Sequence, residues 1–133
     1  MIDIENDVFD TVAEALRTAH PGISVFGEYV EMPAKFPAVT LVEADNRVLE
    51  NYRTLNIENA VASMFELNIY SNKATGKKAE AKAIADIADT VMASIGYTRT
   101  FREQIPNLKD ATIYRIVCRY QATVDKDLWV YHN

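Results

Sequence analysis

Residues 60–71 read AVASMFELNIYS, and the alternation of apolar and polar side chains in this stretch decides the fold. Side chains of a β-strand point alternately to its two faces, so a period of two predicts a strand with one face against a core. We expect this strand to lie at the centre of a sheet. The face predicted to be buried carries Val61, Phe65, Leu67 and Ile69, and the other carries Met64, Glu66, Asn68 and Tyr70.

On either side of this strand, apolar residues recur at spacings of three and four, which is the period of an amphipathic helix. The first predicted helix covers Asp3–Ala19, with Asp3 as a plausible N-cap. The second covers Gly76–Ile95 and ends at Gly96, because glycine readily adopts the left-handed conformation that closes many helices. Each helix must therefore bury one apolar stripe.

Further apolar runs predict more strands, in the element order α-β-β-β-α-β-β. Residues 44–59 between two of them are polar and irregular, and this segment is longer than the usual connection of about 4–6 residues. We expect it to be either a projecting hairpin or a functional loop. The predicted strands are Ile23–Tyr29, Ala38–Val42, Tyr97–Ile105 and Ala111–Val124, and Leu128–Tyr131 is a short last strand or a tail.

Runs of strands separated by helices predict an α+β fold, with two amphipathic helices packed on one face of a mostly antiparallel β-sheet. The chain has 133 residues, of which 49% are hydrophobic, so it can bury one core and we expect residues 1–133 to form a single domain. The residues of the last long strand that should face the helices are Tyr114, Ile116, Cys118, Tyr120 and Ala122.

The other face of this predicted sheet should be mixed in character. Arg115 and Arg119 would lie beside Glu66 and Tyr70, and Glu66 could pair with either arginine across the strands. Such a surface is neither apolar enough for a core nor plainly solvated. It suits a wet interface with another protein.

The charge balance limits the classes of partner. Nineteen acidic residues against fourteen basic ones leave a formal net charge of −5, which disfavours tight binding to a nucleic-acid backbone. No apolar stretch approaches the roughly 18 residues that cross a bilayer, so we expect no membrane contact. The single cysteine, Cys118, lies in a predicted strand and should be a buried thiol.

The residue types that catalysis requires do not combine into a known pattern. His20 and His132 lack the ligand spacing of a metal site. Residues 71–78 lie where a phosphate-binding loop would, but Ser71 replaces the glycine that wraps the phosphates and Lys78 replaces the hydroxyl that holds magnesium. We therefore predict no enzymatic activity, no catalytic residue, no metal and no cofactor.

Basic residues gather where the second predicted helix begins. There they oppose the helix macrodipole, and neighbours at a spacing of four repel each other. Two interpretations stay open: a solvated face, partly offset by a pairing of Lys82 with Asp86, or a patch for an anion or an acidic partner. The residues of this lysine patch are Lys73, Lys77, Lys78 and Lys82.

Several stretches together resemble the tail terminator family of tailed bacteriophages and prophages, a group of small head-tail neck proteins sometimes labelled minor capsid or tail-completion proteins. The resemblance, with the chain length and element order, covers nearly the whole sequence. The stretches that carry it are Phe26–Val30, Phe36–Val39, Glu66–Lys73, Gly76–Lys82, Asp110–Arg115 and Arg119-Tyr120.

This resemblance implies a structural virion protein that forms a ring, expected to be a hexamer, at the head-proximal end of the tail tube. The ring would stop tube polymerisation and join the tail to the head. Its partners would be copies of itself, the tail tube protein and head-closure or connector proteins. DNA would pass through without specific binding, repelled by an acidic lumen. The protein would be found in the host bacterial cytoplasm during assembly and then in the tail or neck of the virion.

A ring needs two different surfaces that match each other on neighbouring subunits. Aromatic and arginine side chains in the polar segment, on the mixed sheet face and in the C-terminal tail are the candidates. Two alternatives to a terminator stay open: a head-closure or other neck connector protein, and a small anion-binding α+β module that uses the lysine patch. The predicted interface residues are Arg47, Leu49, Tyr52, Arg53, Glu66, Tyr70, Arg115, Arg119, Trp129 and Tyr131.

Overall fold

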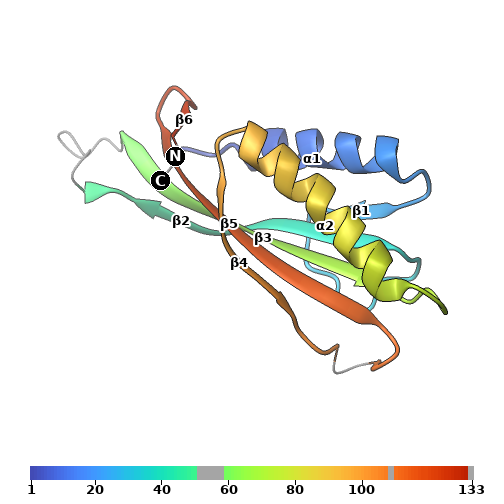
Figure 1. Cartoon of the computed structure of the whole chain (residues 1–133). Coiled ribbons are helices and arrows are strands. Elements are labelled where there is room, and N and C mark those ends of the chain that lie inside the picture. The colour runs from blue at the N-terminus through green and yellow to red at the C-terminus, as the bar shows by residue number, and fades with distance from the viewer. Residues whose placement is uncertain (51–58, 108–109, 132–133) are drawn as a thin grey trace.

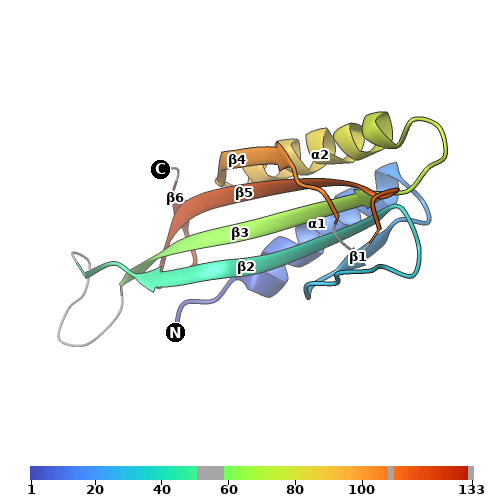
Figure 2. The same ribbon diagram turned by 90° about the horizontal axis from the view of Figure 1, so that it is seen from below.

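A computed structural model describes residues 1–50, 59–107 and 110–131 of the chain (Figure 1). Two helices pack on one face of a mostly antiparallel six-stranded sheet, which confirms the predicted α+β fold (Figure 2). The elements, in chain order, are α1 (Glu5–Ala19), β1 (Ser24–Phe26), β2 (Ala38–Val48), β3 (Ala60–Ser71), α2 (Lys77–Ser94), β4 (Thr98–Gln104), β5 (Tyr114–Asp125) and β6 (Val130–Tyr131).

Strand β3 lies at the centre of the sheet, as its sequence predicts. The strand order is β1-β2-β3-β5-β4, and β6 pairs with β5. Every pairing is antiparallel except that of β1 with β2, which is parallel. The β1 strand is shorter than the predicted Ile23–Tyr29, because the chain leaves the sheet after Phe26.

The core forms between the helices and the predicted apolar face of β3 and β5. Phe65 is fully buried, and its ring meets that of Tyr97 edge to face, with 5.3 Å between centroids. Leu67 pairs with Cys118 in the ladder, and burial raises the pKa of the Cys118 thiol, as expected for an unreactive buried cysteine. The predicted core residues of both strands belong to one cluster: Val61, Phe65, Leu67, Ile69, Ile116, Cys118, Tyr120 and Ala122, with partly buried Tyr114 against it.

The predicted end of the second helix is confirmed, but the predicted N-cap of the first is wrong: the residue before α1 is Ile4, and no side chain caps the helix. The Asp3 carboxylate accepts the backbone N–H of Glu5 at 2.9 Å, although the helix itself begins at Glu5 rather than at Asp3. At the end of α2, Gly96 has φ +96° and the N–H of Tyr97 donates to the Met92 carbonyl at 3.0 Å. Gly96 is thus the C-terminal cap that the sequence indicates.

The prediction that residues 44–48 are irregular is wrong. Strand β2 continues to Val48, which pairs with Val61, and a bulge between Glu43 and Asp45 interrupts the ladder. Asp45, Asn46 and Arg47 are exposed in this part of the strand, so it lacks the buried apolar residues by which a strand is predicted. The two strands therefore run on together as the arms of a hairpin (Figure 1).

The second face of the sheet is partly covered by the chain itself, which the sequence does not predict. Two segments lie over the end of this face where Tyr70 is, one within residues 27–37 and one that includes Asn107 and Ile113. The small apolar cluster that they complete consists of Ala38, Tyr70 and Ile113, with Phe26 and Phe36 packed against it. Ile113, predicted as part of a strand, precedes β5.

We predict that Phe65→Ala and Leu67→Ala lower the free energy of unfolding by about 2–5 kcal/mol each, because each leaves a cavity in the close-packed core. Chemical denaturation monitored by circular dichroism measures the loss. Glu103→Ala, at an exposed position of β4, is the control and should stay within about 0.5 kcal/mol of the natural chain. Equal stability of all three variants would contradict the core assignment.

Candidate functional site

The uncovered part of the second sheet face carries an ion pair backed by an aromatic ring. Glu66 lies directly opposite Arg119 in the β3–β5 ladder, and the Arg119 Nε is 3.4 Å from the Glu66 Oε2. The Arg119 guanidinium also lies over the Phe101 ring of β4, 5.0 Å from its centroid. The Arg119 side chain is 43% exposed, so this predicted interface residue is open to a partner.

Arg115, the other predicted arginine, has a different and uncharged partner. Its Nε and Nη2 donate to the Asn68 Oδ1 at 3.0 and 2.7 Å, and its guanidinium lies 5.8 Å from the centroid of the Tyr70 ring. Of the two pairings predicted for Glu66, the structure has the one with Arg119. The register decides this, because Arg115 lies opposite Tyr70 rather than Glu66.

Tyr70 does not offer the free surface that was predicted for it. Its side chain is 1% exposed, since the loops that cover this end of the sheet pack over it. Desolvation by this burial raises the pKa of Tyr70 to about 12, although the Arg115 charge acts in the opposite direction. Tyr70 does lie on the face of β3 opposite the main core, as predicted, but the loops that cover it were not predicted.

Trp129 is held out into solvent by a tightly bonded turn, residues 125–129, which we call the Trp129 turn. The Asp125 Oδ1 accepts the N–H groups of Asp127 at 2.9 Å and Trp129 at 3.0 Å, and its Oδ2 accepts the Tyr131 hydroxyl at 2.9 Å. Leu128 adopts φ +65°, a conformation that a leucine seldom takes. The Trp129 side chain is 70% exposed and that of Tyr131 is 53% exposed.

Strand β6 ties this turn to the end of α2 (Figure 1). A Cβ added at Gly96 would lie 2.8 Å from the Val130 Cγ1, so the close approach of the two segments requires glycine there. Trp129 was predicted from the sequence, but Asp125 was not. The signal was present, because an Asp at the start of a turn commonly accepts the N–H two residues later.

The predicted interface residues of the β2–β3 hairpin are only partly described. Arg47 is exposed, and Leu49 is partly buried with its N–H donating to the Ala60 carbonyl at 3.0 Å. Tyr52 and Arg53 lie outside the described residues.

The four residues of the lysine patch differ in their surroundings. Lys73, Lys78 and Lys82 are exposed, whereas the Lys77 Nζ donates to the Thr112 carbonyl at 2.9 Å. Asp86, expected to offset Lys82, instead accepts from the Arg102 Nη1 at 3.1 Å.

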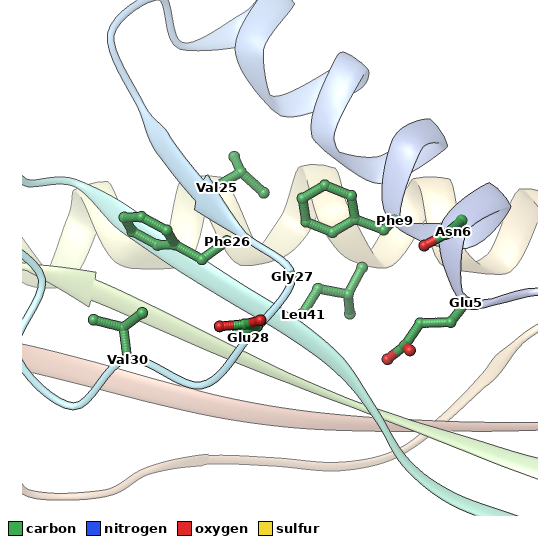
Figure 3. A pocket seen from close by; sticks show the side chains of 9 residues that line it. All are labelled: Glu5, Asn6, Phe9, Val25, Phe26, Gly27, Glu28, Val30 and Leu41. Atoms are coloured by element: carbon green, nitrogen blue, oxygen red, sulfur yellow. The ribbon is translucent and has the colours of Figure 1, made fainter.

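A groove of about 480 Å³, which the sequence does not predict, opens between the start of α1 and the edge of β1. We call it the α1–β1 groove. Figure 3 shows the ring of Phe9 and the side chain of Leu41 beside the backbone at Gly27, while the ring of Phe26 points away from Phe9. The remaining lining residues are Glu5, Asn6, Val25, Glu28 and Val30.

Metal and membrane features are missing from the part of the chain that the structure describes. No three His, Cys, Asp or Glu side chains in it are grouped so that they could hold a metal ion. Neither of the two described helices is long and apolar enough to cross a membrane.

Comparison with known proteins identifies a shared fold. Neither a protein-family model nor a curated protein matches the sequence. A solved structure described as "Virion of native gene transfer agent (GTA) particle" contains a similar chain, with TM-score 0.67 and 16% sequence identity. The likeness covers 92% of this chain and 94% of that one, so the two proteins share the fold from end to end.

We predict that Gly96→Ala destabilises the protein more than Gly22→Ala does. Both glycines have positive φ, +96° and +93°, but only at Gly96 does an added Cβ meet other atoms within 4 Å. Gly22→Ala should cost about 1–2 kcal/mol for its backbone conformation, and Gly96→Ala about 1–3 kcal/mol more for the clash with Val130. Thermal unfolding of both variants measures the difference, and equal losses would contradict the close packing of β6.

We predict that the Trp129 turn loosens only in acid. Partial desolvation raises the pKa of Asp125, but hydrogen bonds from Trp129, Tyr131 and Asp127 outweigh it and lower the pKa below the ordinary value of 3.8. A depressed pKa stabilises the turn above the ordinary value, and this contribution is lost as the pH falls through the folded-state pKa.

The emission of Trp129, the single tryptophan, reports this transition. It should stay constant from pH 8 to pH 5 and change below about pH 4, before global unfolding is seen by circular dichroism. Asp125→Asn removes the titrating group and should abolish the separate step. A transition that persists in this variant would rule out Asp125 as its cause.

Proposed function

We propose that this chain is a structural protein of a phage-like virion and acts as its tail terminator. In this role it forms a ring at the head-proximal end of the tail tube, stops tube polymerisation and provides the surface that joins the head. The observation that carries the proposal is the end-to-end fold likeness to a chain of a gene transfer agent virion. Among the structural proteins of such a particle, the resemblance of the sequence to tail terminators favours the terminator role.

The surface chemistry supports a protein that works by contact with copies of itself. The exposed Trp129 turn, the Arg119–Glu66 pair over Phe101 and the α1–β1 groove lie on different parts of the molecule. Ring formation requires two different surfaces of this kind on each subunit. Aromatic and arginine side chains, which these surfaces display, commonly supply most of the energy of an interface.

The net charge of −5 supports a channel through which DNA passes without binding. Like charges repel, so an acidic ring would let the phosphate backbone slide past, whereas a basic one would hold it by releasing counterions. The tail tube protein and a head-closure or connector protein are the expected neighbours on the two sides of the ring. A head-closure or other neck protein is the alternative role.

Deleting the gene in the cells that make the particle tests the terminator role. Tube subunits add to a growing end until something caps it, so we expect tails of uncontrolled length and free heads by electron microscopy. Expression of the natural chain from a plasmid should restore uniform tails. Tails of normal length without heads would identify a head-closure protein instead, and complete, infectious or transducing particles would overturn the virion role.

A further inference from the structure

The connection between β1 and β2, residues 27–37, covers the end of the second sheet face where Tyr70 lies, and we call it the strap. It passes on the side of the sheet away from the helices (Figure 1). Within the described part of the chain, the backbone of residues 27–36 makes no hydrogen bond. At the end of the strap, the Pro37 carbonyl accepts the Ser24 N–H at 3.1 Å. The strap is therefore held mainly by the packing of its side chains.

This packing is limited. Of the strap residues, Pro33 is buried and Phe36 is partly buried, while most of the others are exposed. Phe36 packs against the small cluster around Tyr70, and among the described residues of the main core none comes from the strap. A cavity of about 140 Å³ remains beside Tyr70, lined on the strap side by Tyr29 and Glu31. A segment with few buried contacts and no backbone hydrogen bonds opens at a low cost in free energy.

The sheet face at the strap contains buried hydroxyl groups that no protein group satisfies. The Tyr70 hydroxyl and the Thr40 Oγ1 are both buried, and neither has a hydrogen-bond partner in the part of the chain that is described. Thr40 lies on this face because it is two residues from Ala38 of the small cluster. The Tyr29 hydroxyl of the strap approaches that of Tyr70 without completing a hydrogen bond. An unpaired buried hydroxyl costs free energy, which is recovered when water reaches it.

The main core treats its buried tyrosines differently. The Tyr97 hydroxyl donates to the Ser63 Oγ at 2.9 Å, and the Tyr120 hydroxyl donates to the Asp89 Oδ1 at 3.0 Å. All three tyrosines are 1% exposed, so Tyr70 is as deeply buried as the two that are paired. The unpaired hydroxyl therefore belongs to the part of the fold that the strap covers.

We propose that the strap is a movable cover, which opens from the second sheet face while the sheet and the main core stay folded, and that the unpaired Tyr70 hydroxyl favours the open form. Opening lets water reach this hydroxyl and uncovers the Tyr70 ring beside the Arg115 guanidinium, which lies 5.8 Å from the ring centroid. Closed, the strap hides Tyr70 and leaves Arg119 as the exposed arginine of this face. The strap thus controls how much of the face is accessible. The inference concerns the single chain and does not depend on the proposed function.

Thiol labelling of the native protein with Ellman's reagent tests the opening. Ala38 is fully buried in the small cluster, and Ala38→Cys adds a thiol there with a small change in volume. The native Cys118, buried in the main core, is the internal control. Without denaturant, the introduced thiol should react at least about tenfold faster than Cys118, because it needs only local opening. Its rate should change little in dilute urea, whereas the rate at Cys118 should rise. Equal rates with the same urea dependence would overturn the proposal.

Two further substitutions in the Ala38→Cys background test what moves and why. Phe36→Ala removes the packing of the strap, so labelling of the introduced thiol should accelerate at least about tenfold while labelling of Cys118 stays the same. Tyr70→Phe removes the unpaired hydroxyl, so the strap should close more tightly and labelling should slow about threefold or more. Tyr97→Phe is the matched control, because it removes a paired hydroxyl of the main core and should leave the rate at position 38 unchanged.

If Phe36→Ala leaves this rate unaltered, the strap is not the segment that moves. If Tyr70→Phe does not slow labelling, or slows it no more than Tyr97→Phe does, the unpaired hydroxyl does not favour the open form. Either result would overturn the proposal.

Discussion

The whole structure depends on β3 being hydrogen-bonded along both edges while one of its faces is sealed against the helices. Its ladder to β5 runs without interruption from Ala60 to Ser71, and β2 pairs along the other edge. A strand held in this way has a fixed register, because a slip of one residue would move Phe65 and Leu67 from the core to the opposite face. The neighbouring strands β2 and β5, and through them the rest of the sheet, are placed by their pairing with β3.

The fixed register also determines the polar chemistry of the second face. Glu66 forms an ion pair with Arg119, and Asn68 accepts hydrogen bonds from Arg115, because the antiparallel pairing places these side chains next to each other. At the Tyr70 end, the chain covers its own sheet with two loops. The exposed part of the face is thereby reduced to the Arg119 end. The second face is therefore divided into a small apolar cluster around Tyr70 and a polar patch around Arg119.

Outside the sheet, several specific contacts hold the C-terminal segment in place. Asp125 accepts three hydrogen bonds, and Gly96 allows β6 to approach the end of α2 closely. These features order a segment whose most prominent side chain, Trp129, makes little contact with the rest of the chain. An ordered turn that presents an exposed tryptophan has a clear physical use in a protein that assembles with copies of itself, because the entropy of ordering the anchor is lost before the partner arrives.

The sequence alone determined the features that follow from local spacing. The period of β3, the two amphipathic helices, the cap at Gly96 and the burial of Cys118 depend only on which residue types recur at which interval, and the structure confirms them. Tertiary structure decided the rest: the continuation of β2 to Val48, the loops over Tyr70 and the groove beside Phe9. These features arise where segments distant in the chain meet, and side-chain periodicity carries no information about which segments will do so.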